Sequence, residues 1–166
     1  MSIRSYLQSR SVDFDFLLHR PTHSATHLAG SLHTPGRSVA KGVLVRGGDS
    51  FVLAVLPATH RVDLARLSKV LGLDADEVRI ATEGEVERVF ADCEPGALPP
   101  FGRLYGLTTV LDLSLALGGD MTFIANMRHE GVRMRFADYE AIEAPIEARF
   151  SVEVDPARGD NHRIAG

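Results

Sequence analysis

The sequence from Gly42 to Pro57, GVLVRGGDSFVLAVLP, predicts the central element of the fold. Two apolar runs rich in β-branched residues, 42–46 and 51–56, flank the Gly-rich residues 47–50. Such runs on either side of a short turn segment are typical of a β-hairpin. Pro57 ends the second strand because proline has no backbone N–H to donate.

The chain after the hairpin predicts a helix, a strand and a second helix. Asp63 can cap a helix that ends just before Gly72, because Asp accepts from helix N-terminal amides and Gly adopts the left-handed cap. Residues 78–81 are a short strand candidate. Thr82 and Glu85 have the spacing of a capping box, which predicts a helix to about Phe90.

The remaining patterns predict further strands and short helices without a regular βαβ rhythm. This mixture indicates an α+β fold with a mixed, partly antiparallel sheet. We expect one compact domain over residues 1–150 and a polar C-terminal tail over 151–166. The remaining predicted elements are strands at 12–18, 108–111, 121–126 and 132–136, a helix over 23–33 with Thr22 as its cap, and a short helix starting at Asp138.

The composition is that of one globular domain, with 166 residues, 45% of them hydrophobic and 24% charged. The net charge of −4 and the lack of a long basic run predict no DNA partner and, for RNA, contact with a single-stranded end. No apolar run approaches the ~20 residues that span a bilayer. Residues 1–10 lack the apolar stretch of a secretory signal, so we expect a cytoplasmic protein without membrane contact.

The segment 92–102, DCEPGALPPFG, is the most informative candidate for a functional site. Its three prolines fix the backbone, and its two glycines let a ligand approach closely. Backbone N–H groups held in this way suit a substrate carbonyl, or the negative charge that develops on it during acyl transfer. The alternative is a rigid connector that only packs against the core.

Lys41 is the second candidate, at the leading edge of the hairpin. It is one of two lysines, with Lys69, while the other sixteen of the eighteen basic residues are arginines. Lysine offers a compact charge with three donors, which suits a phosphate or a carbonyl oxygen. The alternative is an ordinary solvated surface charge.

Histidine spacing raises the question of a metal site. His19, His23 and His27 recur at every fourth residue, and such a spacing on a helix can bind zinc. However, no acidic third ligand lies at a recognised spacing, and Pro21 would interrupt the helix. We therefore expect no metal. His129, between two predicted strands, could instead line a pocket.

Cys93, the only cysteine, lies beside the proline-rich segment and cannot form an internal disulfide. The neighbouring Asp92 and Glu94 raise the pKa of its thiol through their charge, so we expect no nucleophilic role. Asp112, at the end of an apolar strand, could anchor a site by hydrogen bonds or serve only as a turn residue.

The order of these segments resembles the YbaK / prolyl-tRNA-synthetase-associated family over residues 22–143. The resemblance implies a compact fold with a mixed, barrel-like β-sheet flanked by helices. It also implies hydrolysis of the ester between a wrong amino acid and the tRNA 3′ end, without a metal or cofactor. The segments that carry it are Val39-Ala40-Lys41, Val52 to Pro57, Arg61 to Leu64, Gly96 to Gly102 and Val110 to Asp112.

The resemblance also assigns roles to residues. Lys41 would hold the terminal adenosine and its phosphate, and the backbone of the Gly-x-x-x-Pro loop would hold the aminoacyl group. Catalysis would be substrate-assisted, with the tRNA ribose hydroxyl supplying the reactive group. The expected catalytic residues are Lys41, Gly96, Ala97, Pro99 and Pro100, and the expected substrate-binding residues are Phe101, Gly102, Asp112, Asn126 and His129.

Gly131 and the pair Ala125-Asn126 depart from the Cys-tRNA deacylase branch of that family, which favours a small amino acid such as alanine instead. We expect a trans-acting aminoacyl-tRNA deacylase, monomeric or weakly dimeric, whose partners are the aminoacyl-tRNA 3′ end and possibly an aminoacyl-tRNA synthetase. One alternative is a non-catalytic module that binds a nucleotide-like ligand or a protein in the same pocket. Another is an interaction domain whose Pro/Gly loop is only structural.

Overall fold

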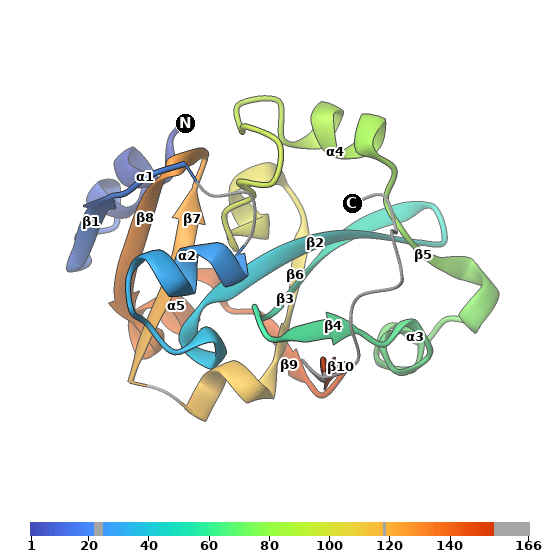
Figure 1. Ribbon diagram of the computed structural model, residues 1–166. Helices are drawn as coiled ribbons and strands as arrows, with labels where there is room; N and C mark the ends of the chain where they lie inside the picture. The colour runs from blue at the N-terminus through green and yellow to red at the C-terminus, as the bar shows by residue number, and fades with distance from the viewer. Residues whose placement is uncertain (22–24, 118, 155–166) are drawn as a thin grey trace.

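The computed structural model describes residues 1–21, 25–117 and 119–154 (Figure 1). Within these residues the chain forms five α-helices, ten strands and four short 3-10 helices. The α-helices are α1 (Ile3–Ser9), α2 (Ala25–Ser31), α3 (Leu64–Leu71), α4 (Glu83–Val89) and α5 (Phe136–Glu143). The 3-10 helices are η1 (Gly36–Ser38), η2 (Ala75–Glu77), η3 (Gly102–Tyr105) and η4 (Leu113–Leu117).

The strands form three sheets. The largest has the order β5-β2-β3-β6-β9, in which β2 is antiparallel to β3 and β5, while β3–β6 and β6–β9 are parallel. The second sheet is antiparallel in the order β1-β8-β7, and the third pairs β10 with β4. The strands are β1 (Phe14–Leu18), β2 (Ala40–Gly47), β3 (Ser50–Pro57), β4 (His60–Val62), β5 (Val78–Ile80), β6 (Thr108–Asp112), β7 (Asp120–Ala125), β8 (Met127–Arg135), β9 (Ile146–Ala148) and β10 (Ser151–Glu153).

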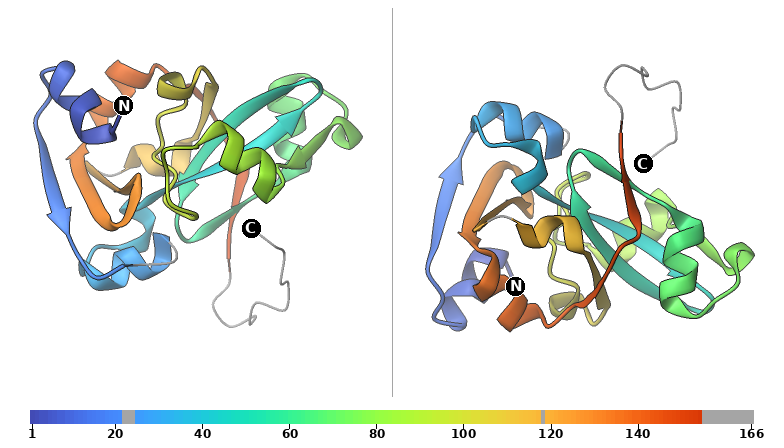
Figure 2. Two further views of the ribbon diagram at one scale, coloured as in Figure 1. Left: turned by 90° about the horizontal axis from the view of Figure 1, so that it is seen from above. Right: turned by 90° about the horizontal axis from the view of Figure 1, so that it is seen from below.

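This architecture confirms the predicted α+β class and the mixed sheet. The barrel-like description needs refinement, because none of the three sheets closes on itself in the part of the chain that the structure describes. Figure 2 shows the three-stranded sheet at one end of the molecule and the β2–β3 hairpin at the other, with the 92–102 loop between them in both views.

The two capped helices form as the sequence predicts. Asp63 accepts from the Arg66 amide at the start of α3, and Gly72 ends that helix with a φ of 69°. Thr82 and Glu85 form both halves of a capping box at the start of α4. Because α4 follows β5 directly, this cap fixes where the helix leaves the edge of the large sheet.

A shared hydrophobic core joins the sheets. Phe101, with no exposed surface, packs its ring edge-on against Phe123 and Tyr139 at centroid distances of 5.5 and 5.0 Å. Leu53 and Leu111 from the large sheet belong to the same cluster. The residues just before η3 are therefore anchored in the centre of the molecule.

Several boundaries differ from the sequence expectations. Helix α1 was not predicted, and α5 begins at Phe136 rather than at Asp138 because β8 ends at Arg135. Strand β10 pairs with β4, so the ordered fold extends past residue 150 into the segment expected to be tail. The expected cap Thr22 and residues 155–166 lie outside the described residues. No described helix has both the length and the apolar character needed to cross a membrane.

Candidate functional site

A cavity of about 360 Å³ lies between strand β2, helix α4 and the 92–102 loop. In the left view of Figure 2, α4 crosses the β2–β3 hairpin and the loop lies beside it. Strand β2 contributes residues 40–44, which include Lys41 and Gly42. The other lining residues are Glu83, Val86 and Glu87 of α4, Pro95, Gly96 and Leu98 of the loop, and Ala25, Ile80, Ala81 and Ile124 around the edge.

Lys41 lies opposite Leu56 in the β2–β3 ladder and is half-buried. It lines the cavity together with Gly96, so the structure brings the early hairpin and the proline-rich loop to one hollow. Gly42, which the sequence analysis did not single out, explains how close they come. A Cβ on Gly42 would lie 3.1 Å from Leu53 Cδ1 and 3.7 Å from the Leu98 carbonyl oxygen.

The loop backbone is held by hydrogen bonds at its start. The Glu94 amide donates to the Asn126 carbonyl oxygen at 2.8 Å, and the Ala97 amide donates to the Glu94 carbonyl oxygen at 3.0 Å. Gly96 has a φ of 81°, a left-handed conformation that favours glycine. The amides of Gly96 and Leu98 donate no hydrogen bond to any described residue, and both residues line the cavity.

Three of the expected catalytic residues lie behind the cavity rather than on its surface. Ala97 is fully buried in a cluster with Leu28 and Val39, and its amide is already bonded within the loop. Pro99 and Pro100 are buried, and the Pro100 carbonyl oxygen accepts from the Tyr139 hydroxyl at 2.7 Å. The structure therefore gives these residues contacts that fix the loop, and of the four loop residues expected to be catalytic only Gly96 lines the cavity.

Phe101 and Gly102 are likewise placed in the core. The Gly102 amide donates to Thr109 Oγ1 at 3.0 Å, and a Cβ on Gly102 would collide with that same atom. Neither residue lines the cavity. The Phe101 ring packs against Phe123 and Tyr139 in the core, and direct substrate binding by either residue stays a prediction.

Asp112 anchors the C-terminal strands instead of the cavity. Its carboxylate accepts from the backbone amides of Ser114, Phe150 and Ser151 at 2.8–2.9 Å. Burial raises the pKa of Asp112, but the hydrogen bonds from Ser114 and Phe150 outweigh it and hold the pKa below its ordinary value. These contacts are those of the turn-residue interpretation, and a role of Asp112 in substrate binding stays a prediction.

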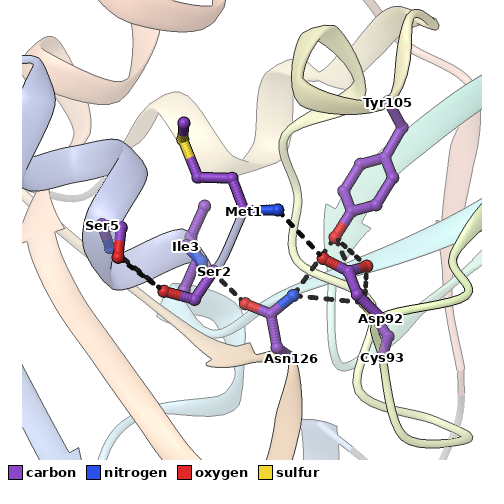
Figure 3. Close-up of polar contacts among 8 residues, drawn as sticks. All are labelled: Met1, Ser2, Ile3, Ser5, Asp92, Cys93, Tyr105 and Asn126. Carbon is purple, nitrogen blue, oxygen red and sulfur yellow. Dashed lines mark hydrogen bonds and ion pairs between the residues drawn. The ribbon is translucent and has the colours of Figure 1, made fainter.

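Asn126 organises the start of the loop from outside the cavity (Figure 3). Its side-chain oxygen accepts from the Ile3 amide at 2.8 Å, and its Nδ2 donates to the Tyr105 hydroxyl oxygen at 3.2 Å. Tyr105 in turn donates to Asp92 Oδ1 at 2.9 Å. This network ties helix α1 to the turn between β7 and β8, where Asn126 has a φ of 59°.

Cys93 lies in the same network, with its Sγ 3.3 Å from the Tyr105 hydroxyl oxygen. Burial raises the pKa of the thiol to about 11; hydrogen bonds from Tyr105 and Asn126 oppose the shift, and the charge of Asp92 adds to it. The thiol is thus protonated near neutral pH. Its pKa is raised, as expected from the charge of Asp92, although burial is the larger cause.

None of the histidines that the structure describes lines the cavity. His129 Nε2 lies 3.8 Å from Glu130 Oε1 on β8, and His19 Nδ1 lies 2.7 Å from the Arg20 carbonyl oxygen. His23 lies outside the described residues. No three His, Cys, Asp or Glu side chains of the described chain are grouped to hold a metal ion.

A family model described as an aminoacyl-tRNA editing domain matches residues 19–142 of this chain. The chain belongs to the aminoacyl-tRNA editing domain family. The match confirms the resemblance drawn from the Lys41 and Gly96 to Gly102 motifs and covers nearly the same residues.

The editing domain is similar in sequence to segments of proline–tRNA ligases. It is 31% identical to the proline–tRNA ligase of Thiobacillus denitrificans over 100 residues. The aligned segment covers 60% of this chain and 17% of the ligase. It is 36% identical to the proline–tRNA ligase of Xanthomonas oryzae pv. oryzae (strain MAFF 311018) over 87 residues. The aligned segment covers 52% of this chain and 15% of the ligase. The matched region thus spans about a sixth of the length of these relatives.

Two solved structures have the same fold as the editing domain. The crystal structure of "hypothetical protein APE2540" superposes with a TM-score of 0.80 at 18% identity, covering 90% of this chain and 99% of that one. A candidate trans-editing enzyme for prolyl tRNA synthetase superposes with a TM-score of 0.77 at 19% identity, covering 90% and 94%.

Helix α4 is the wall of the editing-domain cavity that the sequence analysis missed. Its capping box predicted the helix but gave no sign that the helix would lie against β2, since that contact joins residues about forty positions apart. Glu85 faces away from the cavity and accepts from Arg79 Nη1 and Nη2 at 2.9 and 2.8 Å. The hydrogen bonds from Arg79 and the Thr82 backbone lower the pKa of Glu85 to about 2.

Proposed function

We propose that this editing domain is a trans-acting deacylase that hydrolyses the ester of a mischarged aminoacyl-tRNA. The observation that carries the proposal is the cavity shared by Lys41, Gly96 and Leu98, in which the amides of Gly96 and Leu98 have no hydrogen-bond acceptor among the described residues. Family membership supports an editing role, and the fold shared with the candidate trans-editing enzyme for prolyl tRNA synthetase supports action in trans.

Lys41 would bind the terminal nucleotide of the tRNA. Lys41 is the one basic residue of the lining among the residues described, and its ammonium group has three donors for phosphate oxygens. The aminoacyl carbonyl would then face the loop. Because the Gly96 and Leu98 amides are fixed by the folded loop, they can stabilise negative charge on that oxygen without rearrangement.

Water would attack the ester with help from the substrate itself. No Ser, Cys or His lies among the described lining residues, so these residues supply no Ser–His or Cys–His pair. An aminoacyl ester is already labile, and positioning together with oxyanion stabilisation contributes most where no strong base is present. The neighbouring ribose hydroxyl of the substrate is well placed to assist, which is the substrate-assisted mechanism implied by the family resemblance.

The acyl group would be small and apolar, such as alanine. The walls around Gly96 are mostly aliphatic, with Ala25, Ala40 and Ile124 among them. The cavity volume of about 360 Å³ is near the lower end of the range for ligand pockets, roughly 300–1,000 Å³. A terminal adenosine leaves little of that volume for a long side chain.

Lys41→Ala tests the proposal against a panel of mischarged tRNAs. We expect kcat/KM to fall by about 10- to 100-fold, since a charge-assisted hydrogen bond contributes about 1.5–3 kcal/mol. Lys69→Ala, which removes the exposed lysine of α3, is the matched control and should keep full activity. Full activity of Lys41→Ala would reject the site. Lack of turnover by the unmodified protein on every member of the panel would instead favour the non-catalytic binding module.

A further inference from the structure

A second hollow, which we call the Arg133 pocket, lies at the other end of helix α2 from the cavity and has a volume of about 340 Å³. Ala25, the first residue of α2, lines the cavity, while Leu32, just past the end of α2, lines the pocket. Figure 1 shows α2 and the segment that follows it lying over β7. The pocket is lined by Leu32, His33, Thr34, Pro35 and Ser38 of that segment, by Gly119, Asp120 and Thr122 at the start of β7, and by Arg133 of β8. Most of these residues are polar, so the pocket suits a different kind of ligand from the aliphatic cavity.

The guanidinium group of Arg133 is held at this pocket. Arg133 lies opposite Asp15 of β1 and Thr122 of β7, and Asp120 is its diagonal neighbour on the same face of the sheet. Both carboxylates are within reach of an arginine side chain at such positions. Arg133 nevertheless forms an ion pair with neither of them, and its Nη2 donates to Thr34 Oγ1 at 3.2 Å. Since a guanidinium has five N–H donors, others of them can serve a ligand in the pocket.

The buried hydroxyl of Thr122 is a second, independent sign of a ligand. Thr122 is only 1% exposed, yet its hydroxyl has no hydrogen-bond partner among the residues that the structure describes. Such groups are uncommon, because burying a polar group without a partner is unfavourable. Thr122 lines the pocket, where a ligand atom would supply the missing partner. The half-buried Ser38 hydroxyl also lines it without a partner in the described chain, and His33 adds an imidazole N–H.

This set of donors suits a phosphate group. Arginine binds phosphate oxygens with two parallel N–H donors, and hydroxyl groups can donate to the remaining oxygens. Asp120, which is exposed, is the one carboxylate among the described lining residues. Its charge opposes an anion, so it should weaken phosphate binding. A zwitterion such as a free amino acid would instead gain from Asp120, and this difference in sign can be measured.

We infer that Arg133, with the hydroxyls of Thr34, Ser38 and Thr122, binds a phosphate group. The phosphate can belong to the backbone of a tRNA strand whose 3′ end occupies the cavity, or to a free phosphate. The tRNA source rests on the proposed deacylase function, whereas the phosphate site itself does not.

The spacing of the two hollows makes the tRNA backbone a suitable source. Ala25 and Leu32 are seven positions apart, which is about 10 Å along a helix at 1.5 Å per residue. Ile124 lines the cavity and Thr122 the pocket, two positions apart on β7 or about 7 Å at 3.3 Å per residue. A single strand that ends in the cavity therefore has the pocket within reach of its backbone.

Two titrations of the full chain test the site and separate the sources. In the first, the Arg133 Nε–H signal and the Thr122 amide signal are followed by NMR during addition of inorganic phosphate, with sodium chloride at matched ionic strength as the blank. In the second, the Kd for uncharged tRNA is measured by fluorescence anisotropy. Arg133→Gln is the main variant. Arg61→Gln, which removes an exposed arginine from β4 in the third sheet, is the charge-matched control.

We expect Arg133→Gln to weaken tRNA binding about 10-fold and Arg61→Gln to change it less than about twofold. Thr122→Val, which keeps the side-chain shape, should weaken binding about threefold without lowering Tm, because it removes a hydroxyl that has no partner in the described fold. Asp120→Asn should tighten binding about two- to threefold. A response to inorganic phosphate alone, with the same Kd for tRNA in Arg133→Gln and Arg61→Gln, would assign the pocket to a free phosphate.

Equal behaviour of Arg133→Gln and Arg61→Gln in both titrations would overturn the inference. Weaker binding of both ligands by Asp120→Asn would also overturn it, since a phosphate gains nothing from that carboxylate. Neither titration involves ester hydrolysis. A protein that hydrolyses no mischarged tRNA would therefore lose the proposed function, while the phosphate site would still stand or fall on these two measurements.

Discussion

Substituting Gly42 by alanine changes the contact between β2 and the loop by a single methyl group. The new Cβ would lie 3.1 Å from Leu53 Cδ1 and 3.7 Å from both Leu98 Cβ and the Leu98 carbonyl oxygen. Leu53 has no exposed surface, so it can yield only by shifting within the core. The Leu98 contacts are ordinary van der Waals distances, but they place the methyl on the cavity wall.

Two opposing effects set the stability of Gly42→Ala. Overpacking of a core costs about 1–3 kcal/mol. Replacing a strand glycine restrains the unfolded chain and returns about 0.5–1 kcal/mol. We therefore expect a net loss near 1 kcal/mol, which lowers Tm by about 2–4 °C in a domain of this size.

The Gly42→Ala substitution should also lower kcat/KM, because the loop amides would move. A shift of a few tenths of an ångström in the loop moves the Gly96 and Leu98 amides relative to Lys41, and catalytic geometry is sensitive to such shifts. We expect kcat/KM for the preferred mischarged tRNA to fall about 10-fold. Gly30→Ala on α2, where a Cβ meets nothing within 4 Å, is the control and should raise Tm without changing activity. Full activity in Gly42→Ala would refute the idea that this close approach positions the site.

Three further predictions address the cap of the cavity wall, the thiol and a buried carboxyl. Thr82→Ala removes the acceptor of the Glu85 amide and should lower the free energy of unfolding by about 1 kcal/mol in urea titration; an unchanged value would contradict a role for the cap. Cys93→Ala should keep kcat/KM within about twofold, because burial keeps the thiol protonated, and a large loss would restore the thiolate as a candidate nucleophile. Burial is the largest cause that raises the pKa of Glu143, although hydrogen bonds from Thr109 and Arg103 oppose it. Because this pKa is higher in the folded state, the associated stability is complete below the unfolded value and is lost as pH rises through the folded one. Relative to the parent, Glu143→Gln should therefore become more stable in urea titrations as pH rises above about 4.5, and a flat difference would disprove the shift.

Local patterns in the sequence predicted the elements whose stabilising contacts are local. The β2–β3 hairpin, the helix between Asp63 and Gly72 and the capping box at Thr82 all depend on residues within a few positions of one another. Helix α1 was missed because its stability depends on distant contacts, such as the bond from the Ile3 amide to Asn126. Strand β10 likewise forms through pairing with β4, about ninety residues earlier in the chain.

The candidate site was predictable only in part, for the same reason. Proline and glycine content singled out the 92–102 loop and the rarity of lysine singled out Lys41, and the structure places Lys41 and Gly96 at one cavity. Composition could not show which loop groups face that cavity. Packing against the core buries Phe101 and the Ala97 side chain, and long-range folding brings Glu83 and Glu87 to the opposite wall.

Backbone NMR of the isotopically labelled protein, titrated with an amide-linked alanyl-adenosine phosphate that cannot be hydrolysed, tests the central arrangement most directly. We predict that the Gly96 and Leu98 amide signals shift together with those of Lys41 and its strand neighbours, and that Lys41→Ala weakens binding about 10-fold or more. Shifts confined to another face of the molecule, with the Gly96 and Leu98 signals unmoved at saturation, would contradict the account.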